Sequence, residues 1–295
     1  MPVSRMELAD FGSPEKIVQA ILAQVPELPI PVPIEELARD LDILEITVLE
    51  TQGFEGGLLT DEERSAGIVL VNEASSRPRR RFTIGHELGH FPSPWHKPAR
   101  PGEFLCTPDD MRRVSVKPAD RTAQMEVEAN RFAALLLLPQ PHFRRDLNRH
   151  RGADIDHILA LADRYDVSKE ATVRRYIELQ DEPCAAVLSQ HGKVLRVYRG
   201  KAFPYVELSA GHFLPDRSLT ARAILPEGKT SDWQEGDAAH WLSSGRGQRL
   251  PTLYEQVHVQ RSGYRLTLLT IDQEAYEDEE EREALAESYQ ARFRR

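Results

Sequence analysis

The stretch of residues 79–90 constrains the fold of this chain more than any other feature of its sequence. It contains no proline, and its apolar residues recur at the spacing of one helical face, so it predicts a helix. His86 and His90 lie four residues apart on the same side of that helix, where both imidazoles can bind one metal ion. Glu87 projects about 100° away around the helix, so it can reach a water molecule at the metal without binding the ion itself.

The pattern H-E-x-x-H is typical of zinc peptidases, although two histidines on a surface helix would give the same letters. A catalytic zinc site has three protein ligands and one open position. The sequence offers Glu126, Glu128 and His96 as candidates for the third ligand. His96 stands six residues after His90, where one class of H-E-x-x-H peptidases has its third histidine. The glycine of that longer pattern is Ser93 here, which argues against His96.

Residues 123–138 predict a second helix, and its C-terminal half is apolar nearly all round, so it should be buried. This helix carries Glu126 and Asn130 on one stripe. An unpaired carboxylate is costly in a core, and a metal ion would supply its partner. Glu126 is the preferred third ligand because Asn130, one turn later, can hydrogen-bond a ligand histidine. Glu128 and His96 stay open as alternatives.

Two motifs in this order resemble the ImmA/IrrE family of zinc metallopeptidases. They are H-E-L-G-H at residues 86–90 and E-V-E-A-N-R-F-A at residues 126–133, the latter followed by L-L-L-L-P at residues 135–139. The resemblance covers roughly residues 10–180. One departure is the proline-rich segment 91–94, where relatives often continue as an apolar helix.

The resemblance implies that His86, His90 and Glu126 bind Zn²⁺ and that Glu87 is the catalytic carboxylate. Zinc lowers the pKa of water and polarises the scissile carbonyl, while Glu87 passes a proton to the departing amine. A further donor should stabilise the oxyanion. His142, Tyr165 and the histidines of the loop at residues 91–121 are the candidates for it.

The implied substrate is a protein, namely a helix-turn-helix transcriptional repressor whose cleavage releases stress-response or mobile-element genes. The alternative is a DNA-binding or sensor regulatory protein whose zinc site is structural or vestigial. An open fourth position on the metal would favour the enzyme, and a fourth protein ligand would favour the structural role.

Composition limits the other possibilities. The chain has 295 residues, of which 40% are hydrophobic. Its net charge of −9 argues against a protein that mainly coats nucleic acid, because binding to phosphates needs a basic face. The sequence shows neither a targeting signal nor a membrane-spanning stretch, so we expect a cytoplasmic protein without a membrane partner. Cys106 and Cys184 form no C-x-x-C pair, and we expect Cys106 to be a buried or incidental residue.

The elements around the metal helix indicate a small mixed α+β domain. Ser13 should cap a helix that ends near residue 25, and a shorter helix should follow at residues 34–41. Three short strands are expected ahead of the metal helix, at residues 43–49, 56–60 and 68–72. We expect residues 68–71 to form an edge strand that pairs with substrate. Residues 91–121 should form an irregular loop that walls the cleft.

The next segment indicates a helical pair. A short helix at residues 141–148 should precede the helices 155–165 and 169–179, which resemble a helix-turn-helix with Ser168 as a cap. Packing against the peptidase core is favoured over DNA binding, because Lys169 is one of few polar residues at the start of the second helix.

Strand patterns dominate the C-terminal part. Two hairpins, at residues 185–198 and 254–271, indicate a small α+β domain with a central antiparallel sheet. The resemblance allows a GAF-like domain there, with a sensor or substrate-binding role. Trp233, Trp241, His240 and Tyr205 could line a ligand pocket, but an ordinary core is favoured.

The fold class is therefore α+β, with a zincin-like domain built from a small sheet, the H-E-x-x-H helix and a buried glutamate helix. We divide the chain into a peptidase domain (1–152), a helix-turn-helix-like subdomain (153–182), a C-terminal domain (183–275) and an acidic tail (276–295). We expect a chain ended after Glu182 to stay folded and loaded with zinc, but to cleave its repressor weakly.

Overall fold

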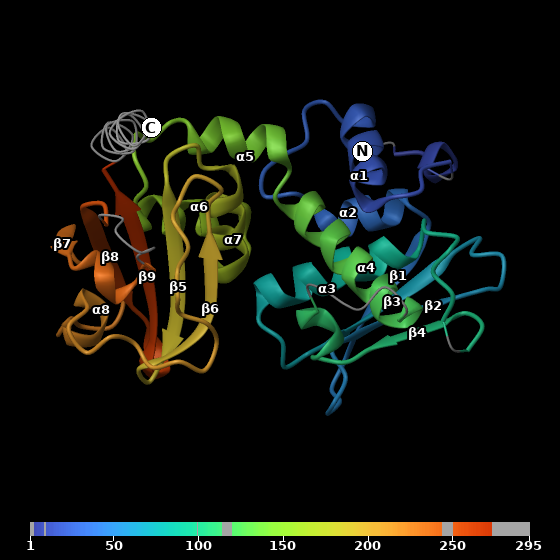
Figure 1. Cartoon of the computed structure of the whole chain (residues 1–295). Helices are drawn as coiled ribbons and strands as arrows, with labels where there is room; N and C mark the ends of the chain where they lie inside the picture. The colour runs from blue at the N-terminus through green and yellow to red at the C-terminus, as the bar shows by residue number, and fades with distance from the viewer. Residues whose placement is uncertain (1–2, 9, 99, 114–119, 244–249, 273–295) are drawn as a thin grey trace, which may run out of the picture. The chain divides into compact units, whose positions relative to one another are not determined.

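The computed structural model describes residues 3–8, 10–98, 100–113, 120–243 and 250–272. Its internal contacts divide the chain into two units. The first contains Met1–Arg144 and Leu161–Ala171, and the second contains Arg145–Ala160 and Thr172–Arg295. Both units mix helices and strands, in agreement with the α+β class (Figure 1).

The helices and strands expected from the sequence are present, with ends shifted by one or two residues. The α-helices are α1 (Pro14–Gln24), α2 (Ile34–Asp40), α3 (Arg77–His90), α4 (Arg121–Leu137), α5 (Gln140–Leu147), α6 (Ile155–Tyr165), α7 (Lys169–Leu179) and α8 (Leu219–Arg222). The strands are β1 (Ile43–Leu49), β2 (Gly56–Thr60), β3 (Gly67–Asn72), β4 (Glu103–Cys106), β5 (Cys184–Gln190), β6 (Lys193–Arg199), β7 (Gln234–Gly236), β8 (Leu253–Val259) and β9 (Tyr264–Ile271).

The sheet of the first unit has the strand order β1-β3-β2-β4. Strand β3 is parallel to β1 and antiparallel to β2, so it lies inside the sheet and is paired on both sides. The expectation that residues 68–71 form an edge strand is therefore wrong. A half-buried interior strand and an edge strand share the same alternation, and the alternation alone does not distinguish them. The strands at the edges of this sheet are β1 and β4, and β4 is antiparallel to β2.

Strand β4 also corrects a second expectation, because it lies within the segment 91–121 that was expected to be irregular. Its buried residues Phe104 and Cys106 alternate with Glu103 and Leu105, of which Leu105 is 57% exposed. This is the period-2 pattern of a strand, but only four residues long and flanked by polar, proline-rich sequence.

Small residues let α3 and α4 approach each other closely. Gly89 of α3 faces Ala129 of α4, and a Cβ atom added to Gly89 would lie 2.9 Å from the Cα atom of Ala129. One turn earlier, a Cβ atom on Gly85 would lie 3.2 Å from the Cβ atom of Ala133. Helices α3 and α4 lie side by side (Figure 1), and this contact brings His86 and His90 next to Glu126.

The turn between α6 and α7 is fixed to the start of α3. Asp166 has a positive φ of 52°, and its carboxylate pairs with Arg77 at 2.6 Å. Its backbone oxygen accepts a hydrogen bond from Arg81 at 3.1 Å. Ser168 caps α7, as expected, by accepting a hydrogen bond from the N–H of Ala171 at 3.2 Å. The turn therefore packs on the metal helix, which is the arrangement favoured from the sequence.

The side chains of α7 offer little to DNA. Thr172 is fully buried, and Arg175 is 5% exposed and pairs with Glu178 at 3.0 Å. Arg174 and Lys169 are exposed. Two exposed cations on one helix are too few to favour DNA binding.

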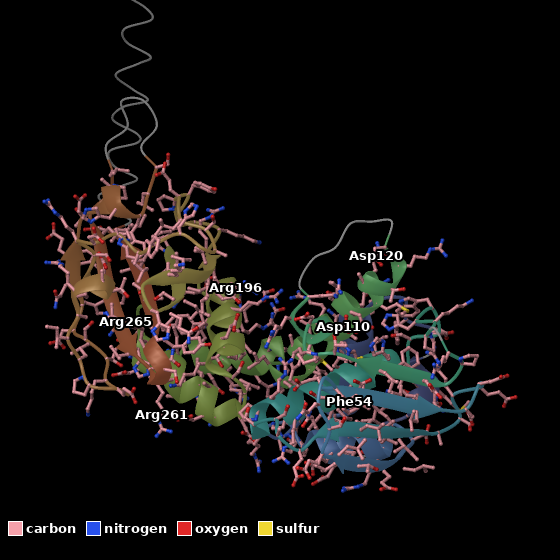
Figure 2. The ribbon with its side chains drawn as sticks, turned by 90° about the horizontal axis from the view of Figure 1, so that it is seen from below. Phe54, Asp110, Asp120, Arg196, Arg261 and Arg265 are labelled. Atoms are coloured by element: carbon pink, nitrogen blue, oxygen red, sulfur yellow. The ribbon has the colours of Figure 1, made fainter. Side chains whose placement is uncertain are left out.

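The second unit contains an antiparallel sheet with the order β6-β5-β9-β8-β7. Its core includes Trp241, which is fully buried and donates a hydrogen bond through Nε1 to Glu255 at 3.0 Å. Trp241 is thus a core residue, whereas Tyr205 is 69% exposed. His240 lines a cavity of about 390 Å³ whose other walls carry several charged side chains. Figure 2 shows Arg196 of β6 among the side chains of this unit.

The division of the chain into four segments at residues 152, 182 and 275 stays a prediction. The acidic tail, 276–295, lies outside the described residues. No helix in the described part of the chain has both the length and the apolar composition of a membrane span.

Candidate metal centre

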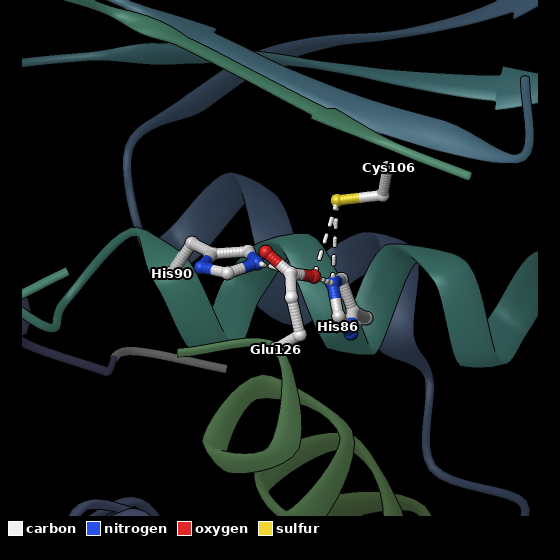
Figure 3. A group of neighbouring side chains, drawn as sticks. All are labelled: His86, His90, Cys106 and Glu126. Carbon is white, nitrogen blue, oxygen red and sulfur yellow. Dashed lines mark hydrogen bonds and ion pairs between the residues drawn. The ribbon is translucent and has the colours of Figure 1, made fainter. Parts of the chain in front are cut away.

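Four side chains from three elements converge in the first unit. His86 and His90 come from α3, Glu126 from α4 and Cys106 from the end of β4. Figure 3 shows the sulfur of Cys106 facing the two imidazoles and the carboxylate from the side of the sheet. One possible ligand atom of each residue lies within 4.8 Å of those of the others, and all four side chains are buried.

The distances between these atoms are close to those of a tetrahedral metal site, with the two imidazole nitrogens nearer to each other than a bound ion requires. The Nε2 atoms of His86 and His90 are 3.0 Å apart, and Oε2 of Glu126 lies 3.2 Å from the first and 3.7 Å from the second. The sulfur of Cys106 lies 3.4 Å from Nε2 of His86 and 3.7 Å from Oε2 of Glu126. Zinc–ligand distances of about 2.0–2.3 Å give a tetrahedron with edges of roughly 3.3–3.8 Å. Two imidazoles, a carboxylate and a thiolate are ligands that zinc accepts.

The electrostatics of the site keep His90 neutral and Glu126 ionised. Burial lowers the pKa of His90 to about 3. Burial opposes ionisation of Glu126, but hydrogen bonds from His86 and His90 outweigh it and lower the pKa of the carboxyl. Neutral imidazole and ionised carboxylate are the forms that bind a metal.

Glu87 lies beside this cluster and not in it. Its side chain is fully buried, and neither carboxylate oxygen has a hydrogen-bond partner among the described residues. Burial, and then the charge of Glu126, raise its pKa well above the usual value. Strand β2 passes directly over the carboxylate, because a Cβ atom on Gly56 would lie 3.0 Å from Oε1 of Glu87. A buried carboxylate without a partner is costly to stability and is typical of a functional group.

Asn130 forms a hydrogen bond with His86 on the side of the ring that faces away from the cluster. Its Oδ1 atom lies 2.9 Å from Nδ1 of His86, while its Nδ2 donates to the backbone oxygens of Asp110 and Arg113 at 2.8 and 3.0 Å. These two bonds fix which way the amide points, so Oδ1 accepts from the Nδ1–H of His86 and leaves Nε2 for a metal. Asp110 is labelled in Figure 2.

The two other candidates for the third ligand lie outside the cluster. His96 contacts His90 on the side away from the ligand atoms, with 2.9 Å between their Nδ1 atoms. Glu128 contacts His96, with 3.0 Å between Oε2 and Nε2. The structure thus places Glu126 with His86 and His90, and it places His96 and Glu128 behind them.

Cys106 is the member of the cluster that the sequence did not reveal. It is buried, as expected, and it lies beside three other side chains that could hold a metal ion. Burial raises the pKa of its thiol well above the usual value, and the charges of Glu87 and Glu126 add to this. The alternation of buried and exposed residues in β4 is the one sequence signal that could have placed it.

Tyr165 is a poor source of the oxyanion donor. It is fully buried and packs against Phe143, with 5.3 Å between the ring centroids. His142 is half-buried on α5 and remains a candidate.

Comparisons with known proteins agree with this geometry. Residues 42–176, which contain β1–β4 and the whole candidate centre, match the family described as the IrrE N-terminal-like domain, a family of peptidases. No curated protein matches the chain. A solved Mycobacterium tuberculosis transcriptional regulator is similar in fold, with a TM-score of 0.55 and 15% identity over 92% of this chain and 81% of that one. Residues 42–176 of this chain therefore match the IrrE N-terminal-like domain, and this match confirms the resemblance to the ImmA/IrrE family.

Proposed function

We propose that this protein is a zinc-dependent endopeptidase. The observation that carries the proposal is the buried set His86, His90 and Glu126, with the unpartnered carboxylate of Glu87 beside it. Metal-binding groups and a carboxylate free to take a proton are the two requirements of hydrolysis by an H-E-x-x-H site.

The residues of the site have separate roles in hydrolysis. When bound, zinc supplies Lewis acidity that polarises a peptide carbonyl and makes water more acidic. Glu87 accepts a proton from the attacking water at a carboxylate oxygen and gives it to the nitrogen of the departing amine. Asn130 orients His86, and the closely packed α3 and α4 keep bulk water away from the buried ligands.

Strand β4 supplies an edge on which an extended substrate can pair. The carbonyl oxygens of Gly102 and Cys106 accept hydrogen bonds from residues of β2 and its flank at 2.9 and 3.0 Å. Because alternate residues of an antiparallel strand point to opposite sides, the N–H and C=O groups of Leu105 point away from β2. A substrate strand paired there would run past Cys106, at the metal cluster.

The proposed substrate is a helix-turn-helix transcriptional repressor, whose cleavage derepresses stress-response or mobile-element genes. The family resemblance supports this, and the name of the structural neighbour, a transcriptional regulator, is compatible with it. The antiparallel sheet of the second unit supports a sensor or substrate-binding role there, of the GAF-like kind that the resemblance suggests.

The position of Cys106 favours a second candidate, a regulatory protein whose zinc is structural. A thiolate on the fourth position would close the site, as in structural zinc centres. For the enzyme to act, the side chain of Cys106 has to leave that position and make room for water and substrate.

The test incubates the full-length protein with the repressor encoded next to its gene, with and without zinc, and identifies products by mass spectrometry. The wild type should cut the repressor at defined bonds. Glu87→Gln should keep its zinc and lose at least about a hundredfold in turnover. Glu126→Ala should lose most of its zinc, because two imidazoles alone hold it poorly. Unchanged cleavage by Glu87→Gln would contradict the assignment of roles.

Substrate pairing is tested in the same assay with Leu105→Pro. Proline removes the N–H that points away from β2, a position at which sheets tolerate it. The variant should keep its zinc and show a raised KM, whereas Leu105→Ala should behave like the wild type. Equal KM values for both variants would exclude pairing at this edge.

A further inference from the structure

A row of hydrogen-bonded side chains runs outward from His90. Its Nδ1 atom lies 2.9 Å from Nδ1 of His96, and Nε2 of His96 lies 3.0 Å from Oε2 of Glu128. The same carboxylate oxygen accepts a hydrogen bond from Nε1 of Trp95 at 2.6 Å. His96 is only 1% exposed, so water does not substitute for these partners.

Only one placement of the protons satisfies every atom in this row. Nε2 of His90 faces the metal cluster, so a neutral His90 that binds metal carries its proton on Nδ1. That proton points at His96, whose Nδ1 has to accept it, and His96 then carries its own proton on Nε2. The Nε2–H in turn donates to the Glu128 carboxylate, which is an acceptor only.

The opposite placement of the protons fails both at His90 and at Glu128. If His96 carried its proton on Nδ1, it would donate to His90 and force the proton of His90 onto Nε2, where a metal ligand needs a lone pair. The unprotonated Nε2 of His96 would then face the carboxylate of Glu128, lone pair against lone pair. Glu128 therefore selects the tautomer of His96, and His96 selects that of His90.

The surrounding structure holds the row in place. The guanidinium of Arg64 donates to the backbone oxygens of His90 and Ser93 at 3.1 and 2.6 Å, and it also bonds that of His96. This fixes the turn that returns His96 to the end of α3. The ring of Phe104 stacks on His90 with 4.8 Å between centroids, which limits rotation of the imidazole.

We propose that His96 and Glu128 form a positioning relay that holds His90 in its metal-binding tautomer, as Asn130 alone does for His86. The relay depends on the metal-binding part of the proposed function and not on peptidase activity. It also explains why a histidine and a glutamate that resemble ligands in the sequence lie close to the site without belonging to the ligand cluster.

The first test measures the zinc affinity of the full-length protein by competition with a chelator. Asparagine places an acceptor near Nδ1 of the original histidine, whereas glutamine places a donor near Nε2. His96→Asn should therefore keep most of the affinity, and His96→Gln, which keeps the contact to Glu128, should lose about 10–100-fold. A merely structural bridge between the loop and α4 would reverse this order, and that result would overturn the proposal.

The carboxylate is tested by Glu128→Ala, with Glu62→Gln as the control at an exposed glutamate. Glu128→Ala should lower zinc affinity by about tenfold or more, Glu128→Gln by less, and Glu62→Gln not at all. Unchanged affinity in Glu128→Ala would contradict the relay.

The second test needs no variant. Nitrogen-15 NMR of the histidine rings in the zinc-loaded wild type should show His90 protonated on Nδ1 and His96 protonated on Nε2. A proton on Nδ1 of His96 would overturn the relay even if zinc binds normally. A protein that binds zinc and shows the expected tautomers but cleaves no repressor would contradict the proposed peptidase activity and leave the relay intact.

Discussion

Cys106 decides which chemistry the centre can perform. Its sulfur completes a four-ligand set at distances that suit a tetrahedron, yet hydrolysis requires the position it fills. A catalytic and a structural zinc site differ in one measurable respect. Removal of the thiol increases function in the catalytic site and abolishes it in the structural site.

We expect Cys106→Ala to keep most of its zinc and to cleave faster than the wild type. A ligand that holds the fourth position by about 1.4 kcal/mol reduces the rate tenfold, so kcat/KM should rise by at least about that factor. The measurements are zinc content by atomic absorption and cleavage of the repressor.

Cys184→Ala is the matched control, because Cys184 is also a fully buried cysteine but lies in β5 of the second unit. Loss of zinc from Cys106→Ala, without any gain in cleavage, would favour the structural role instead.

The spacing of residues in the sequence predicts some parts of the candidate site and not others. Four residues between His86 and His90 suffice to predict that they share a helical face, because helical geometry is local. The choice among Glu126, Glu128 and His96 depends on how α3, α4 and the intervening loop pack, which local patterns do not contain. The preference for Glu126 came from the chemistry of Asn130, and the structure brings Asn130 to His86.

At the scale of elements, the crossing of α3 and α4 controls the spacing of the ligands. Gly85 and Gly89 lie one turn apart and face alanines, so the two helices approach more closely than larger side chains would allow. The sequence predicted both helices but not this contact, since pairing between helices is not a local property. The same holds for β4, whose four residues were too short a pattern to recognise within a proline-rich segment.

Gly89→Ala should separate the helices and weaken the metal site. Alanine gains about 1 kcal/mol in helix propensity over glycine, but overpacking typically costs about 1–3 kcal/mol, so the net effect should be destabilising. Zinc affinity should fall as well, because Glu126 moves away from the histidines. Both effects are measured by thermal unfolding and chelator competition.

Gly12→Ala provides the control, because a Cβ atom there would meet nothing within 4 Å. A Gly89→Ala variant with unchanged zinc affinity would show that the helix contact does not set the ligand spacing.

At the scale of the whole molecule, the two units share the helical pair. Residues 161–171 group with the first unit, while 145–160 and 172–179 group with the second. Within the second unit, Gln256 of β8 accepts a hydrogen bond from the N–H of Ile155 at 2.8 Å. Sequence patterns located both helices correctly, but their assignment to units depends on such contacts between residues about a hundred positions apart.

These contacts change the expectation for a chain ended after Glu182. Residues 145–160 and 172–182 would lack the rest of their unit, and the buried Ile155 would lose its contact with Gln256. We now expect this fragment to be insoluble or to unfold at a clearly lower temperature than the full chain, as measured by circular dichroism. Co-expression with residues 183–295 should restore solubility. A soluble, zinc-loaded fragment with a normal melting temperature would support the modular division instead.

The burial of the proposed metal ligands would link zinc supply to the survival of the protein. His86, His90, Glu126 and the neighbouring Glu87 are all at most 9% exposed, so without an ion the folded chain carries polar groups that water would solvate better. At a hundred times its dissociation constant, zinc adds about 2.7 kcal/mol to the stability of the folded state. Zinc should therefore raise the melting temperature by several degrees, and an equal melting temperature in a chelator would contradict this. In a zinc-starved cell, more of the chain would be unfolded and degraded, so the amount of protein, and not only its activity, would follow the supply of the metal.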